Sequence, residues 1–293
     1  MKTGRYMIVR ILLTVLLSFA MVGYLACSAV TALLSPSVCT SIIEDEGLAE
    51  KVYAALEKDF KSAYNTTAIP PETYMDAITT EWLEEEMQAH AEARFDYMNT
   101  PDKHEITYDT DFTALEESIT AFFYEYAESI DYEPDDVFEE KLSETIENAK
   151  KTVLKRMDAF YLDTLYENGM LTKVQRYLPY LNGLSWGLWG LTLVLIVTLI
   201  LLDRSGGWRR SYWTGCGVFC GGVLAAAVPG YILMTDRISG FAIKDPIVYA
   251  AITDLIEYFV YGLLVKAAIF AAVGLIFIAI SVVFNKKPKE AEK

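Results

Sequence analysis

Residues 7–34 read MIVRILLTVLLSFAMVGYLACSAVTALL, which is 28 positions with one charged side chain, Arg10. A bilayer core about 30 Å thick requires about 20 predominantly apolar residues in a helix. This segment is therefore long enough to cross a membrane. It is also longer than the apolar region of a cleaved signal peptide, which is about 7 to 15 residues. We therefore expect it to remain in the chain as an anchor.

Three more segments have the same character: 178–202, 212–234 and 258–284. Trp186 and Trp189 stand near the start of the first of these, and tryptophan favours the boundary between lipid and water. The sequence therefore predicts an all-α integral membrane protein with four transmembrane helices. Its first expected partner is the lipid bilayer.

The charges are separated from the apolar segments. Residues 36–177 contain 33 Asp and Glu against 12 Lys and Arg, whereas the rest of the chain contains 7 acidic and 13 basic residues. About 140 residues is an ordinary size for an independent domain. We predict an N-terminal anchor region (1–35), an acidic domain (36–177), a region with three membrane helices (178–284) and a basic tail (285–293).

Basic residues predict the orientation in the membrane. They gather at the N-terminus, in the connection 203–211 and in the tail (Lys2, Arg5, Arg10, Arg204, Arg209, Arg210, Lys286, Lys287, Lys289 and Lys293). Short loops rich in Lys and Arg stay on the cytoplasmic side. Four spans then place both termini in the cytoplasm and the acidic domain outside, which predicts a multi-pass protein of the plasma membrane.

The acidic domain has a helical repeat of apolar residues. One stripe begins at Leu48 and ends near Thr67, and a second follows a cap at Thr80. Asp109 or Thr110 would cap a third helix, whose stripe reaches Ile130. A single long helix is expected from 135 to 168. Four such helices predict an antiparallel extracytoplasmic helical bundle.

No motif for chemistry stands out in this domain. The chain has two histidines, His90 and His104, and we expect His90 at the boundary of the core even though Glu86 precedes it by one turn. The loop from Asp109 resembles a calcium-binding loop but lacks the required central Gly. The only cysteine outside the apolar segments is Cys39, which we expect to be a small buried residue, the alternative being a disulfide between two chains. We predict no metal, no cofactor and no enzymatic activity.

Two features fall within the predicted membrane helices. Gly217, Gly221 and Ala225 recur every four residues, a spacing of small residues that lets helices approach closely in lipid; the neighbour is either within the chain or a second copy. Lys266 is an intramembrane charge. Either it pairs with Asp254, Glu257 or an anionic ligand, or its long side chain reaches the outer boundary of the membrane.

One apolar helix, an outer helical domain and a second apolar helix form a layout similar to the sensor halves of bacterial chemoreceptors and histidine kinases. The similarity ends after Leu202, where two further spans follow. We expect a non-enzymatic binding, sensing or assembly protein whose outer domain binds an envelope or membrane protein, another cell-envelope component or a cation, and which could also assemble with copies of itself. The alternative is a subunit of a channel or transporter, with the acidic domain concentrating cations at its mouth. The acidic charge predicts no nucleic acid partner.

Overall fold

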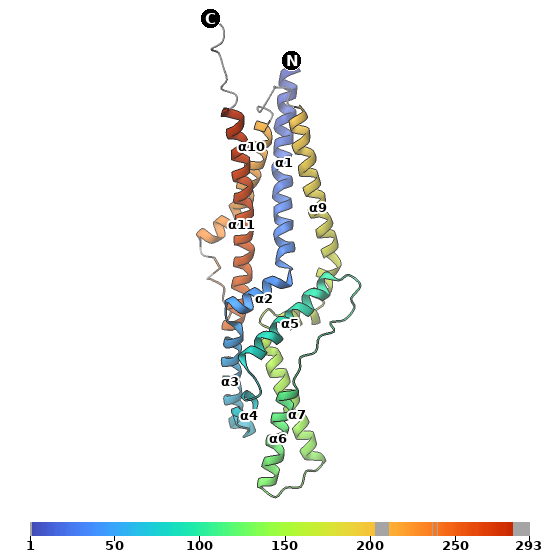
Figure 1. The fold of residues 1–293 in the computed structure, drawn as a ribbon, viewed down its shortest axis with the longest axis vertical. Helices are drawn as coiled ribbons and strands as arrows, with labels where there is room; N and C mark the ends of the chain where they lie inside the picture. The colour runs from blue at the N-terminus through green and yellow to red at the C-terminus, as the bar shows by residue number, and fades with distance from the viewer. Residues whose placement is uncertain (1, 203–210, 236, 239, 284–293) are drawn as a thin grey trace. The chain divides into compact units, whose positions relative to one another are not determined.

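The computed structural model describes residues 2–202, 211–235, 237–238 and 240–283. Within these residues the chain is helical and contains no strand (Figure 1). The helices are α1 (Lys2–Leu33), α2 (Pro36–Asp45), α3 (Leu48–Thr67), α4 (Pro71–Met75), α5 (Thr80–Asn99), α6 (Thr113–Ser129), α7 (Asp136–Met157), α8 (Leu162–Glu167), α9 (Met170–Leu202), α10 (Tyr212–Met234) and α11 (Pro246–Val283).

Four helices are long and apolar enough to cross a membrane: Tyr6–Leu33 within α1, and all of α9, α10 and α11. The prediction of an all-helical chain with four such helices is therefore confirmed. α9 and α11 begin 8 and 12 residues before the predicted starts at 178 and 258. The basic residues of the predicted connection, Arg204, Arg209 and Arg210, and the predicted tail 285–293 lie outside the described residues.

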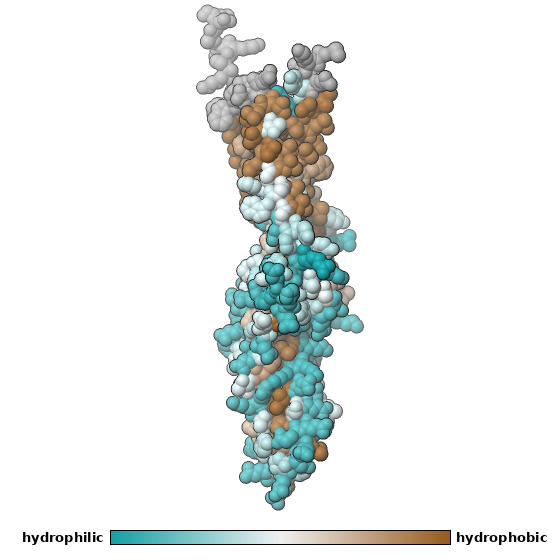
Figure 2. Space-filling view, turned by 90° about the vertical axis from the view of Figure 1, so that its right-hand side faces the viewer, coloured by the Kyte–Doolittle hydropathy of each residue, from teal (hydrophilic) through white to brown (hydrophobic). Residues whose placement is uncertain are grey.

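The chain divides into two compact units. The apolar unit comprises Met1–Leu34, Tyr177–Phe241 and Ile256–Lys293, and the acidic unit comprises Ser35–Arg176 and Ala242–Leu255. The surface of the first is mostly hydrophobic and that of the second mostly hydrophilic (Figure 2). The second unit therefore contains a segment, 242–255, that the sequence did not assign to it. α9 and α11 each contribute residues to both units.

In the acidic unit, α3 and α5 supply much of the core. Leu48, Val52, Leu56 and Phe60 recur every four residues and are buried, as expected for one face of a helix. Phe60 stacks on Tyr74 of α4 with ring centroids 4.2 Å apart. The Thr79 hydroxyl accepts a hydrogen bond from the Trp82 backbone N–H, so that Thr79, one residue before the expected Thr80, caps α5.

The predicted single helix over 135–168 is wrong, because the chain breaks it after Met157. The Asp158 carboxylate accepts hydrogen bonds from the backbone N–H groups of Leu162 (2.6 Å) and Asp163 (3.1 Å) and so caps the separate helix α8. Tyr161 takes a left-handed conformation with φ 55°. A local side-chain cap competes successfully with continuation of the helix here.

Two expectations for α6 are also corrected. The expected cap at Asp109 or Thr110 is replaced by Asp111. The Asp111 Oδ1 atom accepts hydrogen bonds from the Thr113 N–H (3.0 Å) and hydroxyl (2.7 Å) in the first turn of α6. The predicted core stripe is buried at Leu115 and Ile119 but leaves Ile130 exposed. The second half of α6 therefore has an apolar face that the core does not cover.

In the apolar unit, buried side chains of α1 pack against those of α9, α10 and α11. One cluster includes Leu17, Met21, Leu199 and Val218, and another joins Leu25 to Ala225, Leu263 and Ala267. Arg10 of α1 is also bound within the unit, since one of its Nη atoms donates to the Leu202 carbonyl at 3.0 Å. A cation at the C-terminal end of α9 is favoured by the helix dipole.

Candidate functional site

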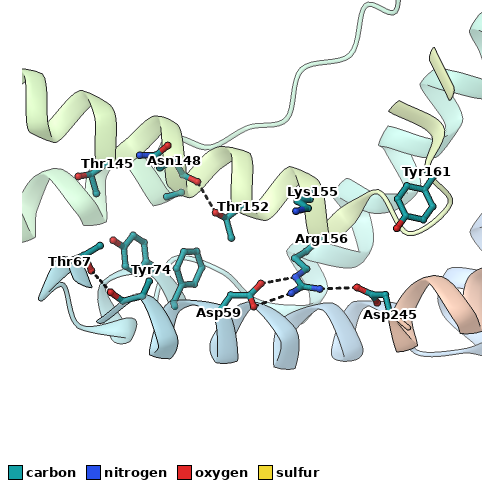
Figure 3. Close-up of a pocket in the computed structure, with 13 residues that line it drawn as sticks. Asp59, Thr67, Tyr74, Thr145, Asn148, Thr152, Lys155, Arg156, Tyr161 and Asp245 are labelled. Carbon is teal, nitrogen blue, oxygen red and sulfur yellow. Dashed lines mark hydrogen bonds and ion pairs between the residues drawn. The ribbon is translucent and has the colours of Figure 1, made fainter. Parts of the chain in front are cut away.

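The candidate site is a pocket of about 720 Å³ in the acidic unit (Figure 3). α3 and α7 supply most of its wall, and α4, the turn before α8 and the segment before α11 complete it. Its lining combines aromatic rings, hydroxyl and amide groups, and charged groups of both signs: Asp59, Phe60, Ala63, Thr67, Tyr74, Thr145, Asn148, Ala149, Thr152, Lys155, Arg156, Tyr161 and Asp245.

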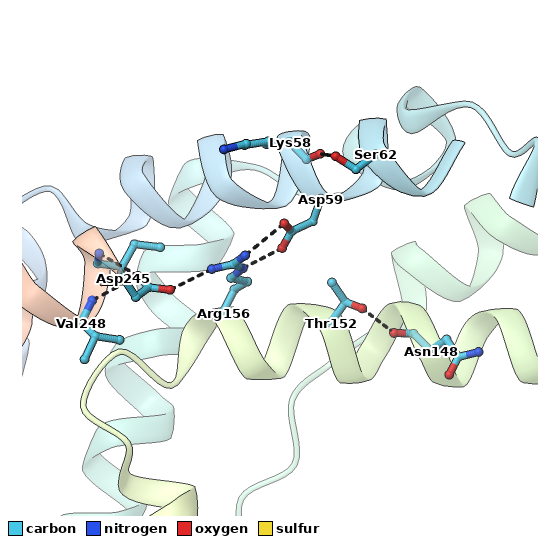
Figure 4. A network of polar contacts seen from close by, with 9 residues as sticks. Lys58, Asp59, Ser62, Asn148, Thr152, Arg156, Asp245 and Val248 are labelled. Carbon is cyan, nitrogen blue, oxygen red and sulfur yellow. Dashed lines mark hydrogen bonds and ion pairs between the residues drawn. The ribbon is translucent and has the colours of Figure 1, made fainter. Parts of the chain in front are cut away.

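Arg156 is the centre of the charged wall (Figure 4). Its Nε and one Nη donate to the two Asp59 carboxylate oxygens at 2.6 and 3.0 Å, and the other Nη donates to Asp245 at 2.9 Å. The hydrogen bonds and charge of Asp59 outweigh partial burial and raise the pKa of Arg156. A two-point contact between a guanidinium and a carboxylate fixes direction as well as charge.

Asp245 has a second role. Its Oδ1 accepts hydrogen bonds from the backbone N–H groups of Ile247 (2.9 Å) and Val248 (3.4 Å), so it caps the N-terminus of α11. The same carboxylate therefore holds both Arg156 and the first turn of α11. This pair of contacts ties segment 242–255 to α7.

The ion pairs separate two pockets. Asp59, Arg156 and Asp245 also line a pocket of about 610 Å³, whose other charged residues are Lys51, Lys58 and Lys244. In the first pocket, Lys155 is exposed and forms no ion pair within the described part of the chain. The first pocket is therefore lined by an unpaired ammonium group, by hydroxyl and amide groups, and by the ring of Tyr74.

A buried ionic cluster joins α5 to α8. His90 Nε2 lies 2.9 Å from Asp163 Oδ2, and the Arg94 guanidinium contacts Asp163 Oδ1 at 2.6 Å. The expectation that His90 lies at the boundary of the core is wrong, because only 3% of its surface is exposed. The ring of His90 pairs with Asp163, whereas Glu86 accepts a hydrogen bond from the Tyr108 hydroxyl.

The two carboxylates of this region have opposite pKa shifts. Burial acts to raise the pKa of Asp163, but the hydrogen bond to His90 and the charge of Arg94 outweigh it and lower the pKa. Burial raises the pKa of Asp158, and the neighbouring charge of Asp163 adds to the increase. Over the described ranges, no group of three or more His, Cys, Asp or Glu side chains is arranged to hold a metal ion.

The predicted glycine row of the apolar unit faces α1. A Cβ atom on Gly217 would lie 2.7 Å from Leu17 Cδ2, and one on Gly221 would lie 3.1 Å from Met21 Cβ. Ala225 is buried against α1 and α11. The Ser18 hydroxyl donates to the Gly217 carbonyl at 2.9 Å across this contact. The row of Gly217, Gly221 and Ala225 therefore packs against α1 of the same chain.

A second glycine contact, between α10 and α11, was not predicted. A Cβ atom on Gly222 would lie 2.7 Å from the Ala267 carbonyl oxygen, and one on Gly274 would overlap the backbone nitrogen of Phe219. The spacing of Gly215 and Gly222, seven residues apart on one helix face, was a usable signal. Nothing in the sequence around Gly274 indicated a partner.

Lys266 lies beside α1. Its ammonium group donates to the Ser28 hydroxyl at 3.1 Å and lies 3.4 Å from the Ser28 carbonyl oxygen. All four cysteines are free thiols. Cys39 is 1% exposed, and burial raises its pKa to about 12. A thiol that is buried and protonated at neutral pH is a poor partner for a disulfide between chains.

Comparison with protein families, curated proteins and solved structures finds no match for this chain. The class of protein therefore follows from the fold alone. It is a helical protein that carries four apolar helices long enough to cross a membrane.

Proposed function

We propose that the protein is a non-enzymatic, membrane-anchored binding protein whose acidic unit binds a small polar molecule in the pocket between α3 and α7. The observation that carries this proposal is the lining of that pocket. Lys155, which forms no ion pair in the described chain, suits an anionic group of the ligand, and Thr67, Thr145 and Asn148 suit its hydroxyl or amide groups. Ligand sites combine an aromatic or apolar wall with a few convergent polar groups in this way.

The alternative of a channel or transporter subunit has less support. In the apolar unit, α10 approaches α1 and α11 so closely at its glycines that little or no room is left there for a Cβ atom. The threonine hydroxyls of α9 at Thr192 and Thr198 donate to carbonyl groups of their own helix. These features favour helices that anchor the protein over helices that line a polar pathway. Ion flux through vesicles containing the pure protein would instead support the channel or transporter alternative.

We further propose that the protein resides in the plasma membrane with both termini in the cytoplasm and residues 36–177 outside. Lys and Arg at the N-terminus, in the connection 203–211 and in the tail support this orientation.

The orientation predicts where a cysteine reacts. In a variant with the four native cysteines replaced by Ala, a cysteine introduced at the exposed position Thr100 is expected to react with a membrane-impermeant maleimide in intact cells. A cysteine at Ser205, which lies outside the described residues, should react only after the cells are permeabilised. The reverse pattern would contradict the proposed orientation.

The pocket predicts ligand-dependent stability. The full chain in non-ionic detergent would be tested by thermal unfolding against a panel of amino acids, sugar acids and phosphorylated sugars. A ligand present at 100 times its Kd raises the free energy of unfolding by about 2.7 kcal/mol, which gives a measurable increase in Tm.

Asn148→Phe should remove this increase because it fills the pocket, whereas Ser143→Phe, at an exposed position of the same helix outside the pocket, should retain it. The proposal fails if no compound raises the Tm, or if both variants respond alike.

A further inference from the structure

The end of the α6–α7 hairpin carries an apolar surface that no part of the acidic unit covers. We call residues 124–140 the hairpin tip. Tyr126 and Val137 are 58% and 59% exposed, and Ile130 is 54% exposed. Tyr124 and Tyr132 are exposed as well. Single exposed apolar side chains are ordinary, but a contiguous group of them indicates an interaction surface.

The hairpin tip is an ordered surface and not a loose loop. The Phe138 ring packs against Tyr124 with centroids 5.2 Å apart, against Phe123 at 5.8 Å and against Tyr132 at 6.3 Å. The Tyr124 hydroxyl donates to Glu139 at 2.8 Å. The rings are therefore held in place before any partner arrives, which lowers the entropic cost of binding.

The charge of the hairpin tip is of one sign. It contains eight acidic residues and no Lys or Arg: Glu125, Glu128, Asp131, Glu133, Asp135, Asp136, Glu139 and Glu140. In the described chain none of these carboxylates forms an ion pair, whereas Glu116, Glu144 and Glu147 elsewhere on α6 and α7 are each paired with a lysine. Uncompensated like charge acts against the compact state.

A pocket of about 500 Å³ lies within this surface. Its wall combines two tyrosines with four of the acidic residues: Tyr124, Glu125, Ala127, Glu128, Asp131, Tyr132, Glu133 and Pro134. Carboxylates and aromatic rings together suit a Lys or Arg side chain, because the carboxylates pair with its charge and the rings attract the cation or contact its apolar stem.

We propose that the hairpin tip docks a segment of a partner polypeptide rich in Lys and Arg, with one basic side chain in this pocket and apolar side chains against Tyr126 and Ile130. Charge complementarity selects this occupant. A negative surface repels anionic lipid, nucleic acid and acidic proteins, and the exposed apolar groups add contact area that a simple cation would not use. The surface is separate from the Arg156 pocket of the proposed function.

The test uses the full chain in non-ionic detergent and a fluorescent 12-residue peptide containing six Lys or Arg and three Leu. Fluorescence anisotropy is expected to show binding that weakens as salt increases, because exposed charges are screened. A peptide with the basic residues replaced by Gln should not bind. Absence of binding by the basic peptide would overturn the proposal.

Matched double variants test the location. Glu128→Gln/Glu133→Gln is expected to weaken peptide binding about tenfold, the effect of losing two charge contacts. Glu85→Gln/Glu92→Gln changes the net charge equally at exposed positions of α5 and should change the affinity less than about twofold. Equal effects would show that the peptide is attracted only by the overall charge, and would overturn the proposal.

A third variant, Tyr126→Ser/Ile130→Ser, tests the apolar contact and is expected to weaken binding of the Leu-containing peptide but not of one in which Ser replaces Leu. The Glu128→Gln/Glu133→Gln variant should keep or raise the Tm, because it removes like charge. A fall in Tm that matched the loss of binding would assign these residues to folding instead of docking.

Discussion

Gly274→Leu is expected to destabilise the apolar helices strongly. A Cβ atom at this position would overlap the backbone nitrogen of Phe219 and lie 2.7 Å from the Phe219 Cα atom. Backbone cannot move aside as a flexible side chain can. We therefore expect a loss at the upper end of the range of about 1–3 kcal/mol that overpacking costs, measured as a lower Tm in detergent.

The same helix provides the control. Gly262 has no atom within 4 Å of a Cβ built on it. Gly262→Leu should therefore leave the Tm almost unchanged, although both variants change the hydrophobicity of α11 equally. Equal melting temperatures for the two variants would show that α10 and α11 do not approach as closely as Gly274 requires.

The other face of α10 gives a related expectation with a second readout. Gly221→Leu would press on Met21 and on the Ser18 backbone of α1. Because these neighbours belong to the same chain, the variant should lose thermal stability while its apparent mass in detergent stays the same. A fall in apparent mass with no loss of stability would mean that the row also joins two copies.

Asp163→Ala is expected to produce a large loss of stability in the acidic unit. It leaves Arg94, whose side chain is 11% exposed, without its carboxylate. Removing one partner of a buried ion pair costs about 3–5 kcal/mol, and we expect a value of about 3 kcal/mol because the Asp163 side chain is itself 34% exposed. Asp96→Ala, which breaks an exposed pair with Lys103, should cost less than about 1 kcal/mol.

The pH dependence of this loss has a definite sign. The pKa of Asp163 is lowered in the folded protein, so its stabilising contribution is complete above the ordinary value of 3.8 and is lost as the pH falls through the lowered pKa. The difference in unfolding free energy between wild type and Asp163→Ala should therefore shrink as the pH falls below 3.8. Asp158, whose pKa is raised, acts in the opposite direction on both proteins.

The sequence was sufficient for the features that depend on local composition. Four apolar helices were predictable because each contains about 20 or more apolar residues with few charges, and α3 was predictable because its core residues recur every four positions. The break after Met157 was not predictable, because the segment 158–161 contains no Pro or Gly. It depends on Asp158, a residue type that serves equally well on a helix surface.

The candidate site was not predictable for a different reason. Arg156 lies 97 positions from Asp59 and 89 positions from Asp245. Each is an ordinary charged residue in its own segment, and no spacing connects them. Likewise, the stripe of α6 correctly indicated a helix, but it did not reveal that the face ending at Ile130 is left uncovered.

The ion pair between Arg156 and Asp245 affects when the acidic unit can finish folding during synthesis of the chain. Asp245 leaves the ribosome only after α9 and α10 have been synthesised. Until then, Asp59 is the one carboxylate partner available to Arg156. The acidic unit is therefore complete only when the start of the last helix has emerged. A chain that stops at Phe241 would retain every residue of α2–α8 and still lack segment 242–255, including the second carboxylate partner of Arg156.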